Sequence, residues 1–261
     1  MKKTLKRNEP QSLINYRLMY PNDDFKKGFR KNAGAEGNRE VNKALITEQG
    51  GICIYCEIDL KDANGRAIND FRVEHFFPEK PQVKDQRNDN INYALHWPNL
   101  FGCCTGGNAP YVIDAERRYT NPEFCCDVDK ANHDWTDQIL DPLTEIPAFP
   151  PLFEFNEIGE MKVSDDTCPE NIKQKSRQTI ELLNLDTPKL QKFREEVIFN
   201  LKQQIFNEFD INIDINERME TLARSYLTQN DSGMLQPFFS TIRWFLGPVA
   251  EKVLHEINYN G

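Results

Sequence analysis

The sequence predicts an α+β fold made of a strand-containing part held together by cysteines and a mostly α-helical C-terminal part. Two observations carry this prediction. Six of the seven cysteines fall between residues 53 and 126, beside short apolar runs, whereas apolar residues recur at helical spacing after Pro169. We therefore expect a basic N-terminal segment over 1–39, a strand-containing domain over 40–165 and a helical domain over 166–261.

The length and composition are those of a globular protein. A chain of 261 residues can form one large or two small domains, and its 17 Phe and 8 Tyr supply bulk for a core. No apolar run approaches the roughly 18 residues of a membrane span. The basic first seven residues are not followed by an apolar segment, unlike a secretory signal. We expect a cytoplasmic protein with reduced cysteines, which favours metal binding or catalysis over disulfides.

The charge is unevenly distributed along the chain. The net charge is −9, which is unusual for a protein that binds nucleic acid by itself. Residues 1–50 carry 11 Lys and Arg against 6 Asp and Glu, whereas the remaining residues carry 21 against 35. The N-terminal segment can therefore lie along a phosphate backbone; the alternative is a solvated terminus. The acidic remainder favours docking onto a basic partner.

Short elements are expected in the first half of the chain. An amphipathic element covers 13–20, and a helix is predicted over 38–49 with Asn38 as its N-cap. The run 71–77 predicts a strand. Residues 105–124 show no periodic pattern, which is typical of an irregular insertion.

Longer elements are expected in the second half. Two short apolar runs within 152–163 predict a hairpin. Pro188 follows Asp and Thr at a strong helix start, and helical spacing then continues to Ile205. A further helix is predicted over 215–226. The last helix is predicted over 234–257, with a kink at Gly247-Pro248.

The cysteines have the spacing of a structural zinc site. Such a site needs four S or N ligands in a tetrahedron, and a Cys-x-x-Cys pair lets two sulfurs reach one ion. Two cysteine doublets follow, and one member of each is expected to bind because adjacent cysteines cannot easily share an ion. The predicted ligands are Cys53, Cys56, Cys104 and Cys126.

Other interpretations of the cysteines remain open. Cys103 and Cys125 are the alternatives within the two doublets, and all four doublet thiols can instead be buried apolar groups. The first pair can also be a redox pair, although no βαβ unit surrounds it. Cys168 is expected to be a buried thiol.

A glutamate beside a histidine ends the predicted strand, and further polar residues follow. Phosphodiester hydrolysis needs a base for water and a cation to neutralise the phosphate. His75 can be the base because its pKa lies near neutrality. Asp127 offers hard oxygens for Mg²⁺, and adjacent Glu74 is less favourable because strand neighbours point to opposite faces. Asn99 can orient His75 through loop hydrogen bonds, and Lys130 can contact a substrate phosphate.

These parts occur in the order found in HNH endonucleases, which the chain resembles. More narrowly, it is similar to the PtuB-like nucleases that accompany an ATPase in Septu-type antiphage systems and in some retron systems. The resemblance covers about residues 40–200, and the run Thr-Ile-Glu-Leu-Leu-Asn-Leu at 179–185 points to this family in particular.

The resemblance implies a zinc-stapled ββα-metal nuclease core with His75 as general base and Asn99 as the middle residue of the motif. It also implies a catalytic Mg²⁺ or another divalent cation, a nucleic-acid substrate and an ATPase subunit (PtuA-like) as partner. In retron systems a reverse transcriptase with its RNA and DNA joins the partners.

Two departures from the family pattern concern the end of the motif. The family has a compact Cys-x-x-Cys-Asn, whereas about twenty residues separate the cysteines here. Asp127 stands where Asn or His is usual, and an alternative alignment takes Asn108 as the last residue. The sequence leaves open whether the substrate is DNA or RNA, and whether the chain is instead a zinc-pinned adaptor with an inactive site.

Overall fold

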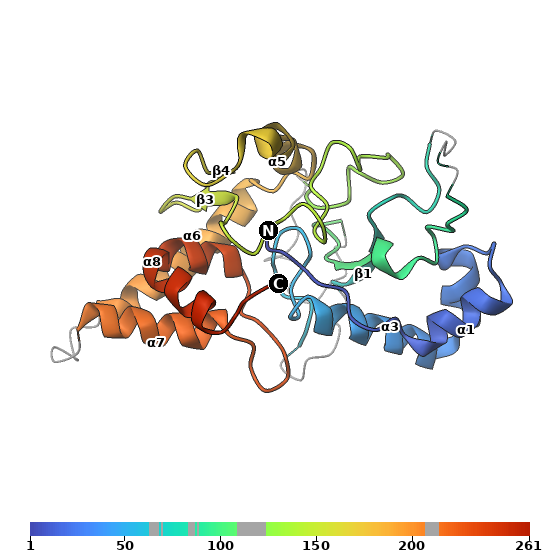
Figure 1. Ribbon diagram of the computed structural model, residues 1–261, viewed down its shortest axis with the longest axis horizontal. Coiled ribbons are helices and arrows are strands. Elements are labelled where there is room, and N and C mark those ends of the chain that lie inside the picture. Colours follow the sequence, from blue (N-terminus) through green and yellow to red (C-terminus); the bar gives the residue numbers. More distant parts are fainter. Residues whose placement is uncertain (63–67, 69, 83–86, 88, 109–123, 207–213) are drawn as a thin grey trace.

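The computed structural model describes residues 1–62, 68, 70–82, 87, 89–108, 124–206 and 214–261. In the described residues, no helix is both long and apolar enough to cross a bilayer. The elements are α1 (Gln11–Met19), a π-helical turn (Phe25–Phe29), α2 (Arg30–Asn32), α3 (Gly34–Glu48), β1 (Arg72–His75), a 3-10 turn (Trp97–Asn99), β2 (Leu100–Cys103), β3 (Phe153–Phe155), β4 (Met161–Val163), α5 (Glu170–Leu182), α6 (Pro188–Ile205), α7 (Ile215–Leu227) and α8 (Phe239–Glu256). Helices occupy both ends of the molecule; β1 lies near α3 at one end, and β3 and β4 lie near α6 and α8 at the other (Figure 1).

The N-terminal helices pack as an ordered layer against the first sheet. Their buried residues share one apolar cluster with Leu100 of β2. The helix expected from Asn38 begins earlier, at Gly34, so the predicted N-cap is wrong. Gly34 has φ +67, a left-handed conformation that glycine adopts readily, and the chain turns there directly from α2 into α3. Asn38 instead donates to the carbonyls of Arg30 and Gly34.

The first sheet is the hairpin β1–β2, and it divides the surrounding core in two. In its antiparallel register, His75 lies opposite Leu100, and Glu74 lies opposite Phe101. Directly paired residues project from the same face of a sheet, and neighbours along a strand project from opposite faces. His75 therefore shares a face with Leu100, on the side of the N-terminal helices, whereas Glu74 shares a face with Phe101, which belongs to a different buried cluster.

The predicted ββα core is only partly present in the described residues. β1 and β2 supply its two strands, but residues 104–108 and 124–140 form turns and irregular backbone after β2. Residues 109–123 of the predicted insertion lie outside the described residues. The structure therefore establishes a mixture of helices and small antiparallel sheets, and the complete ββα core stays a prediction.

The second half of the chain follows its predicted elements closely. The hairpin forms as β3 and β4, and α6 begins at Pro188, where the Thr187 hydroxyl accepts a hydrogen bond from the backbone N–H of Leu190. The predicted kink of the last helix is confirmed, because Gly247 leaves the helical conformation before Pro248. That helix begins at Phe239 rather than 234, after the left-handed Phe238.

The buried core continues across residue 165, where the sequence predicts a domain boundary. Leu183, Leu185 and Leu190 lie in the same apolar cluster as Cys53 and its neighbours. A second cluster joins Ile52 to α6, α7 and α8. The helical part is therefore packed directly onto the cysteine-containing part. The buried core shows no gap at 165 in the described residues, so the predicted boundary stays a prediction.

A buried carboxylate ties the two parts together. Glu57 accepts hydrogen bonds from the backbone N–H and the hydroxyl of Ser240 at 2.8 and 2.6 Å, and its carbonyl accepts from the N–H of Phe238. The amino group of Met1 lies 3.0 Å from the same carboxylate. An acidic side chain at a helix N-terminus also interacts favourably with the unpaired N–H groups there. The start of α8 is thus fixed beside Cys56.

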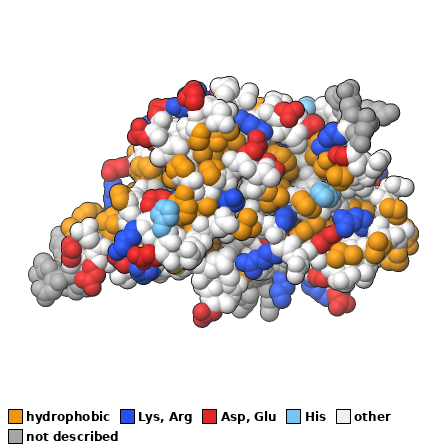
Figure 2. Space-filling model, viewed as in Figure 1, with side chains coloured by type: hydrophobic (Ala, Val, Ile, Leu, Met, Phe, Trp, Pro, Cys, Tyr) orange, Lys and Arg blue, Asp and Glu red, His pale blue; other side chains and the backbone are white. Residues whose placement is uncertain are grey.

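The charged side chains show no single pattern on the surface. On the face shown in Figure 2, Lys and Arg side chains lie interspersed with Asp and Glu. The net charge of −9 therefore does not form one continuous acidic field on that face.

We predict that Gly159→Ala lowers the free energy of unfolding by about 2–4 kcal/mol. Gly159 has φ +81 in the β3–β4 turn, and an added Cβ would lie 2.0 Å from the backbone oxygen of Gln191 on α6. Gly233→Ala is the matched control, because its φ is +76 but nothing lies within 4 Å of the added atom. Urea unfolding should show a loss of about 1 kcal/mol for the control, and equal losses would contradict the predicted clash.

Candidate functional site

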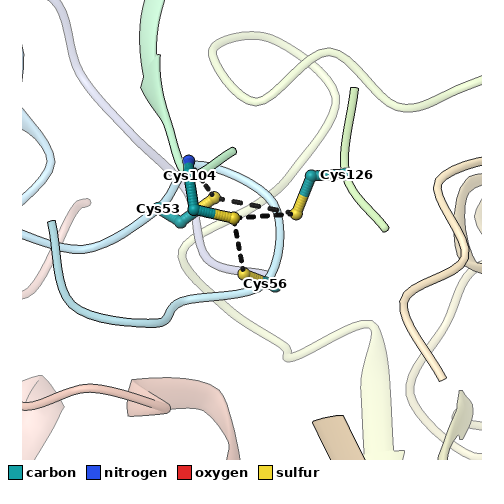
Figure 3. A group of neighbouring side chains, drawn as sticks. All are labelled: Cys53, Cys56, Cys104 and Cys126. Carbon is teal, nitrogen blue, oxygen red and sulfur yellow. Dashed lines mark hydrogen bonds between the residues drawn. The ribbon is translucent and has the colours of Figure 1, made fainter. Parts of the chain in front are cut away.

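Four cysteines converge between the first sheet and α5. The sulfurs of Cys53, Cys56, Cys104 and Cys126 all lie within 4.8 Å of one another (Figure 3). The separations are 3.9 Å between Cys53 and Cys126, 3.7 Å between Cys56 and Cys104, and 3.5 Å between Cys104 and Cys126. All four side chains are buried. The cluster can hold a metal ion.

The sulfur separations fit a tetrahedral zinc site. With Zn–S bonds of about 2.3 Å, the sulfurs of a tetrahedron lie about 3.8 Å apart. The four residues brought together are the four that the sequence predicts as ligands. Cys103 and Cys125 lie just outside this group, at 3.8 Å from the Cys53 sulfur and 3.7 Å from the Cys126 sulfur respectively. The identity of the metal and the choice within each doublet remain predictions.

The local backbone explains why these sulfurs meet. The chain turns at Cys53–Cys56, where the N–H of Glu57 donates to the carbonyl of Cys53 and Glu57 has φ +64. The N–H of Ile54 donates to Gly102 of β2, which brings the turn beside Cys104. The N–H of Cys104 points at the Cys53 sulfur at 3.4 Å. A donor so placed stabilises a thiolate, the form that binds metal.

His75 is held in a defined orientation at the end of β1. Its Nε2 lies 3.1 Å from the carbonyl oxygen of Ala94. A carbonyl can only accept, so Nε2 carries the proton and Nδ1 of the neutral ring keeps its lone pair. The ring of Phe25 packs edge-on against the imidazole, with centroids 5.4 Å apart. Burial lowers the pKa of His75 below its usual 6.5, so the neutral form predominates at pH 7.

Asn99 closes the loop that follows His75. Its Oδ1 accepts from the N–H of Phe77 at 2.7 Å, and its Nδ2 donates to the carbonyls of Phe77 and Tyr93, both at 2.8 Å. The carbonyl of Asn99 also accepts from the N–H of Phe76. Asn99 therefore makes the kind of loop contact that the sequence predicts for it. Its effect on the orientation of His75 stays a prediction.

The other predicted polar residues lie on the opposite face of β1. Lys130 donates from Nζ to Glu74 Oε1 at 2.7 Å and to the carbonyl of His75 at 2.8 Å. Tyr55 donates its hydroxyl to the same glutamate oxygen at 3.3 Å. Asp127 forms an ion pair with Arg72. Because strand neighbours face opposite ways, the structure does not bring Glu74 and Asp127 together with the His75 imidazole.

This arrangement corrects the contact predicted for Lys130. The lysine is fully buried, and its ammonium group is already bound to Glu74 and to the backbone of β1. A substrate phosphate cannot reach it there. Sequence reasoning failed because a lysine near a motif is usually exposed, and only the tertiary structure shows that this one satisfies a buried carboxylate.

In their observed positions, the carboxylates of Glu74 and Asp127 are also unsuited to binding a hydrated Mg²⁺. Lys130 neutralises Glu74, and Arg72 neutralises Asp127, so each carboxylate already has a cation. Burial and the nearby charge of Asp127 raise the pKa of Glu74 to about 7, although Lys130 lowers it. A carboxylate that is partly protonated near neutral pH and already paired with a lysine is a poor ligand for a hard cation. No step of catalysis is therefore assigned to these two residues.

Sequence reasoning missed three groups around His75. They are the ring of Phe25, the carbonyl of Ala94 and the carboxylate of Glu79, whose charge raises the pKa of His75 against the effect of burial. Glu79 lies only four residues after the histidine, so its position in the sequence could have indicated that it lies near the imidazole. Phe25 and Ala94 carry no signal in the sequence, because only the packing of distant segments brings them to the imidazole.

The chain is similar to a known protein over most of its length. It is 29% identical over 218 residues to an Escherichia coli protein named "Retron Ec83 putative HNH endonuclease", and the match covers 77% of this chain and 80% of that protein. The similarity confirms the predicted enzyme class, an HNH endonuclease. No family model matches the sequence. The Septu-type assignment and the ATPase partner are not shown by this relative.

We predict that the purified chain contains about one zinc ion and that Cys53→Ser, Cys56→Ser, Cys104→Ser and Cys126→Ser each remove it and lower the melting temperature. Replacing one of four ligands opens the tetrahedron, and structural zinc supplies folding free energy. Cys103→Ser and Cys125→Ser are matched controls from the same doublets and should keep the metal. Elemental analysis that finds the metal lost from the controls but kept in Cys104→Ser would reverse the ligand assignment.

We also predict that Lys130→Met destabilises the fold by about 3–5 kcal/mol, because it leaves Glu74 buried without its cation. The double variant Lys130→Met with Glu74→Gln should recover part of this loss. Lys162→Met, which removes an exposed partner of Glu154, should change the stability little because solvent screens an exposed ion pair. A loss as small as that of Lys162→Met in chemical unfolding would show that Lys130 is not a buried structural cation.

Proposed function

We propose that the chain is a metal-dependent HNH endonuclease that hydrolyses phosphodiester bonds as the effector of an ATPase-coupled antiphage defence complex, with His75 as general base. The observation that carries the catalytic part is the geometry of His75. Its Nε2 is bound to the Ala94 carbonyl, and its neutral ring keeps a lone pair on Nδ1. A base with this tautomer and a lowered pKa can take a proton from water at neutral pH.

The remaining residues of the proposed site support His75. Asn99 fixes the loop that follows the histidine, through three side-chain hydrogen bonds to its backbone. Phe25 restricts rotation of the imidazole by packing against its edge. Lys130 holds the carbonyl of His75 from the opposite face of β1. These contacts keep Nδ1 in one direction, and a fixed base needs less reorganisation in the transition state.

Two metals belong to the proposal in different ways. Zinc would be held by Cys53, Cys56, Cys104 and Cys126, and when bound it would supply folding energy rather than chemistry. Mg²⁺ or another divalent cation would neutralise charge on the phosphate, as the reaction class requires. No ligand is assigned to that cation, because Glu74 and Asp127 are neutralised as they lie.

The defence context rests on similarity. The E. coli relative is named as a retron protein, and the resemblance to PtuB-like nucleases adds the ATPase subunit and, in retron systems, a reverse transcriptase with its RNA and DNA. The many acidic side chains of residues 51–261 suit a subunit that docks onto basic partners.

A second function is favoured by one observation. The ion pairs of Glu74 with Lys130 and of Asp127 with Arg72 occupy the two carboxylates that the sequence predicts as ligands of a catalytic cation. A zinc-pinned adaptor with an inactive HNH site would have this property. Binding of nucleic acid or protein without any cleavage under all metal conditions would favour the adaptor.

We predict that His75→Ala reduces the cleavage rate by about 10²–10⁴-fold while zinc content and melting temperature stay close to those of the wild type. The imidazole acts on water, so its removal leaves the cysteine cluster intact. The control is the variant His133→Ala, because His133 is exposed and lies outside this site. This variant should cleave at the wild-type rate. Equal losses of zinc in both histidine variants would show that the effect is structural.

We further predict the pH dependence of the reaction. The neutral form of His75 is the active form, and burial lowers its pKa. Cleavage should therefore persist as the pH falls through 6.5, the usual histidine value, and decline only below it. Rates measured between pH 5 and 8 with metal in excess test this, and a decline centred above pH 6.5 would contradict the assignment.

A further inference from the structure

The basic residues of the N-terminal segment separate into two groups in the structure. Lys2 is buried, and the partly buried Lys6 pairs with Glu48. Arg17 pairs with Glu9. Arg7 and Arg39 are exposed, and so are four residues that lie within six positions of one another and form what we call the basic face: Lys26, Lys27, Arg30 and Lys31. Among the described residues, no ion pair joins the basic face to an acidic side chain.

The basic face is fixed beside His75. The segment that carries it runs from the π-helical turn into α2, and its apolar side chains Phe25 and Phe29 are buried and stacked at 5.1 Å. Phe25 contacts the imidazole of His75. The N–H groups of Phe25 and Lys26 donate to Glu79 Oε1 at 2.7 and 2.9 Å, and Asp24 caps the turn. The segment that carries the basic face is therefore anchored next to His75 through Phe25.

A groove of about 650 Å³ lies on the other side of the same segment. Its lining includes Arg17, Asn22, Asn90, Ile91, Asn92 and His96. Asn92 donates to the carbonyls of Pro21 and Asp23, and its Oδ1 accepts from the N–H of Ala94, whose carbonyl holds His75. Pro21 and Asn22 line the groove and the basic face follows a few residues later in the chain, while Asn92 links the groove to the loop whose Ala94 carbonyl holds His75.

The chemistry of this surface suits one class of ligand. Lysine and arginine neutralise phosphates, and side-chain amides hydrogen-bond to base edges. The residues that line the groove supply the amides of Asn22 and Asn90, the imidazole of His96 and the guanidinium of Arg17, which pairs with Glu9, and none of the lining residues is acidic. An acidic peptide could bind the basic face through its carboxylates, but it has no base edges to hydrogen-bond to the side-chain amides of the groove.

We propose that the basic face and the adjoining groove form the surface on which a nucleic-acid strand is held against His75. The proposal rests on the proposed role of His75 as general base. The same phosphate chemistry is offered by DNA and RNA, so the two strands are distinguished by experiment. This surface belongs to the same chain as His75. It gives a protein of net negative charge a local positively charged site for a negatively charged strand.

The test measures binding separately from cleavage. Fluorescein-labelled single strands of about 20 nucleotides, DNA and RNA of one sequence, are titrated without added divalent cation with full-length His75→Ala protein, whose cleavage is expected to be slow. Replacing Lys26, Lys27, Arg30 and Lys31 by Gln should raise the Kd at least tenfold. The slope of log affinity against log salt should become less steep by up to about 2.8, because each phosphate contact contributes about 0.7 for a single strand.

Two matched variants separate local contacts from net charge. Exchanging Lys for Arg and Arg for Lys within the basic face keeps its charge and should keep the affinity within about threefold. A quadruple Gln variant on the C-terminal elements removes the same charge at distant exposed sites and should bind like its parent. Its positions are Lys162, Lys192, Arg224 and Lys252.

Each result decides the proposal. A Kd unchanged in the basic-face variant, or raised equally in the distant variant, overturns it. So does failure of the parent to bind either strand, or equal binding of an acidic peptide of the same charge that competes fully with the strand. If wild-type protein never cleaves but the basic-face variant alone loses binding, the proposed nuclease activity fails and the surface stands. A stronger loss for one strand identifies DNA or RNA as the preferred ligand.

Discussion

The convergence of four buried cysteines is the constraint on which the rest of the structure depends. The strands of this protein are three or four residues long, and each sheet has only two of them. A two-stranded hairpin of this size is marginal in water by itself. The cysteines join the turn at 53–56, the end of β2 and the segment at 126, which are far apart in the sequence. A metal at this point would close loops that hydrogen bonds alone would hold weakly.

The C-terminal helices pack against this centre. Leu183 and Leu185 enter the same buried cluster from the side of α5, and the N–H of Cys126 donates to the carbonyl of Leu183. Glu57, the residue after Cys56, holds the start of α8. The helical part is therefore more than an appended docking unit, because it covers the cysteine turn. This contact offers a route by which a partner bound to the helices can influence the nuclease part.

The alternation of side chains along β1 places His75 and Glu74 on opposite faces of the strand. His75 faces the N-terminal helices, where burial keeps it neutral, and Glu74 faces the cysteine side, where Lys130 compensates its charge. Lys130 also binds the carbonyl of His75, so it connects the two faces through the strand. A buried lysine here stabilises the backbone that carries His75. The ion pairs beneath β1 are also what an activating rearrangement would have to open before carboxylates could bind a cation.

The sequence by itself determined the local elements and the chemistry of the main residues. Helical spacing together with Thr187 and Pro188 placed α6, and Gly247-Pro248 placed the kink of α8, because caps and prolines act within a few residues. The spacing of the cysteines indicated a metal site with one ligand from each doublet but left the choice within each doublet open, and the order of His75 and Asn99 indicated the enzyme class. Only the tertiary structure decided which neutralising partner each charge receives. Lys130 is buried, Asp127 pairs with Arg72, and Phe25 lies on His75, because these contacts join segments tens of residues apart whose packing no local pattern encodes.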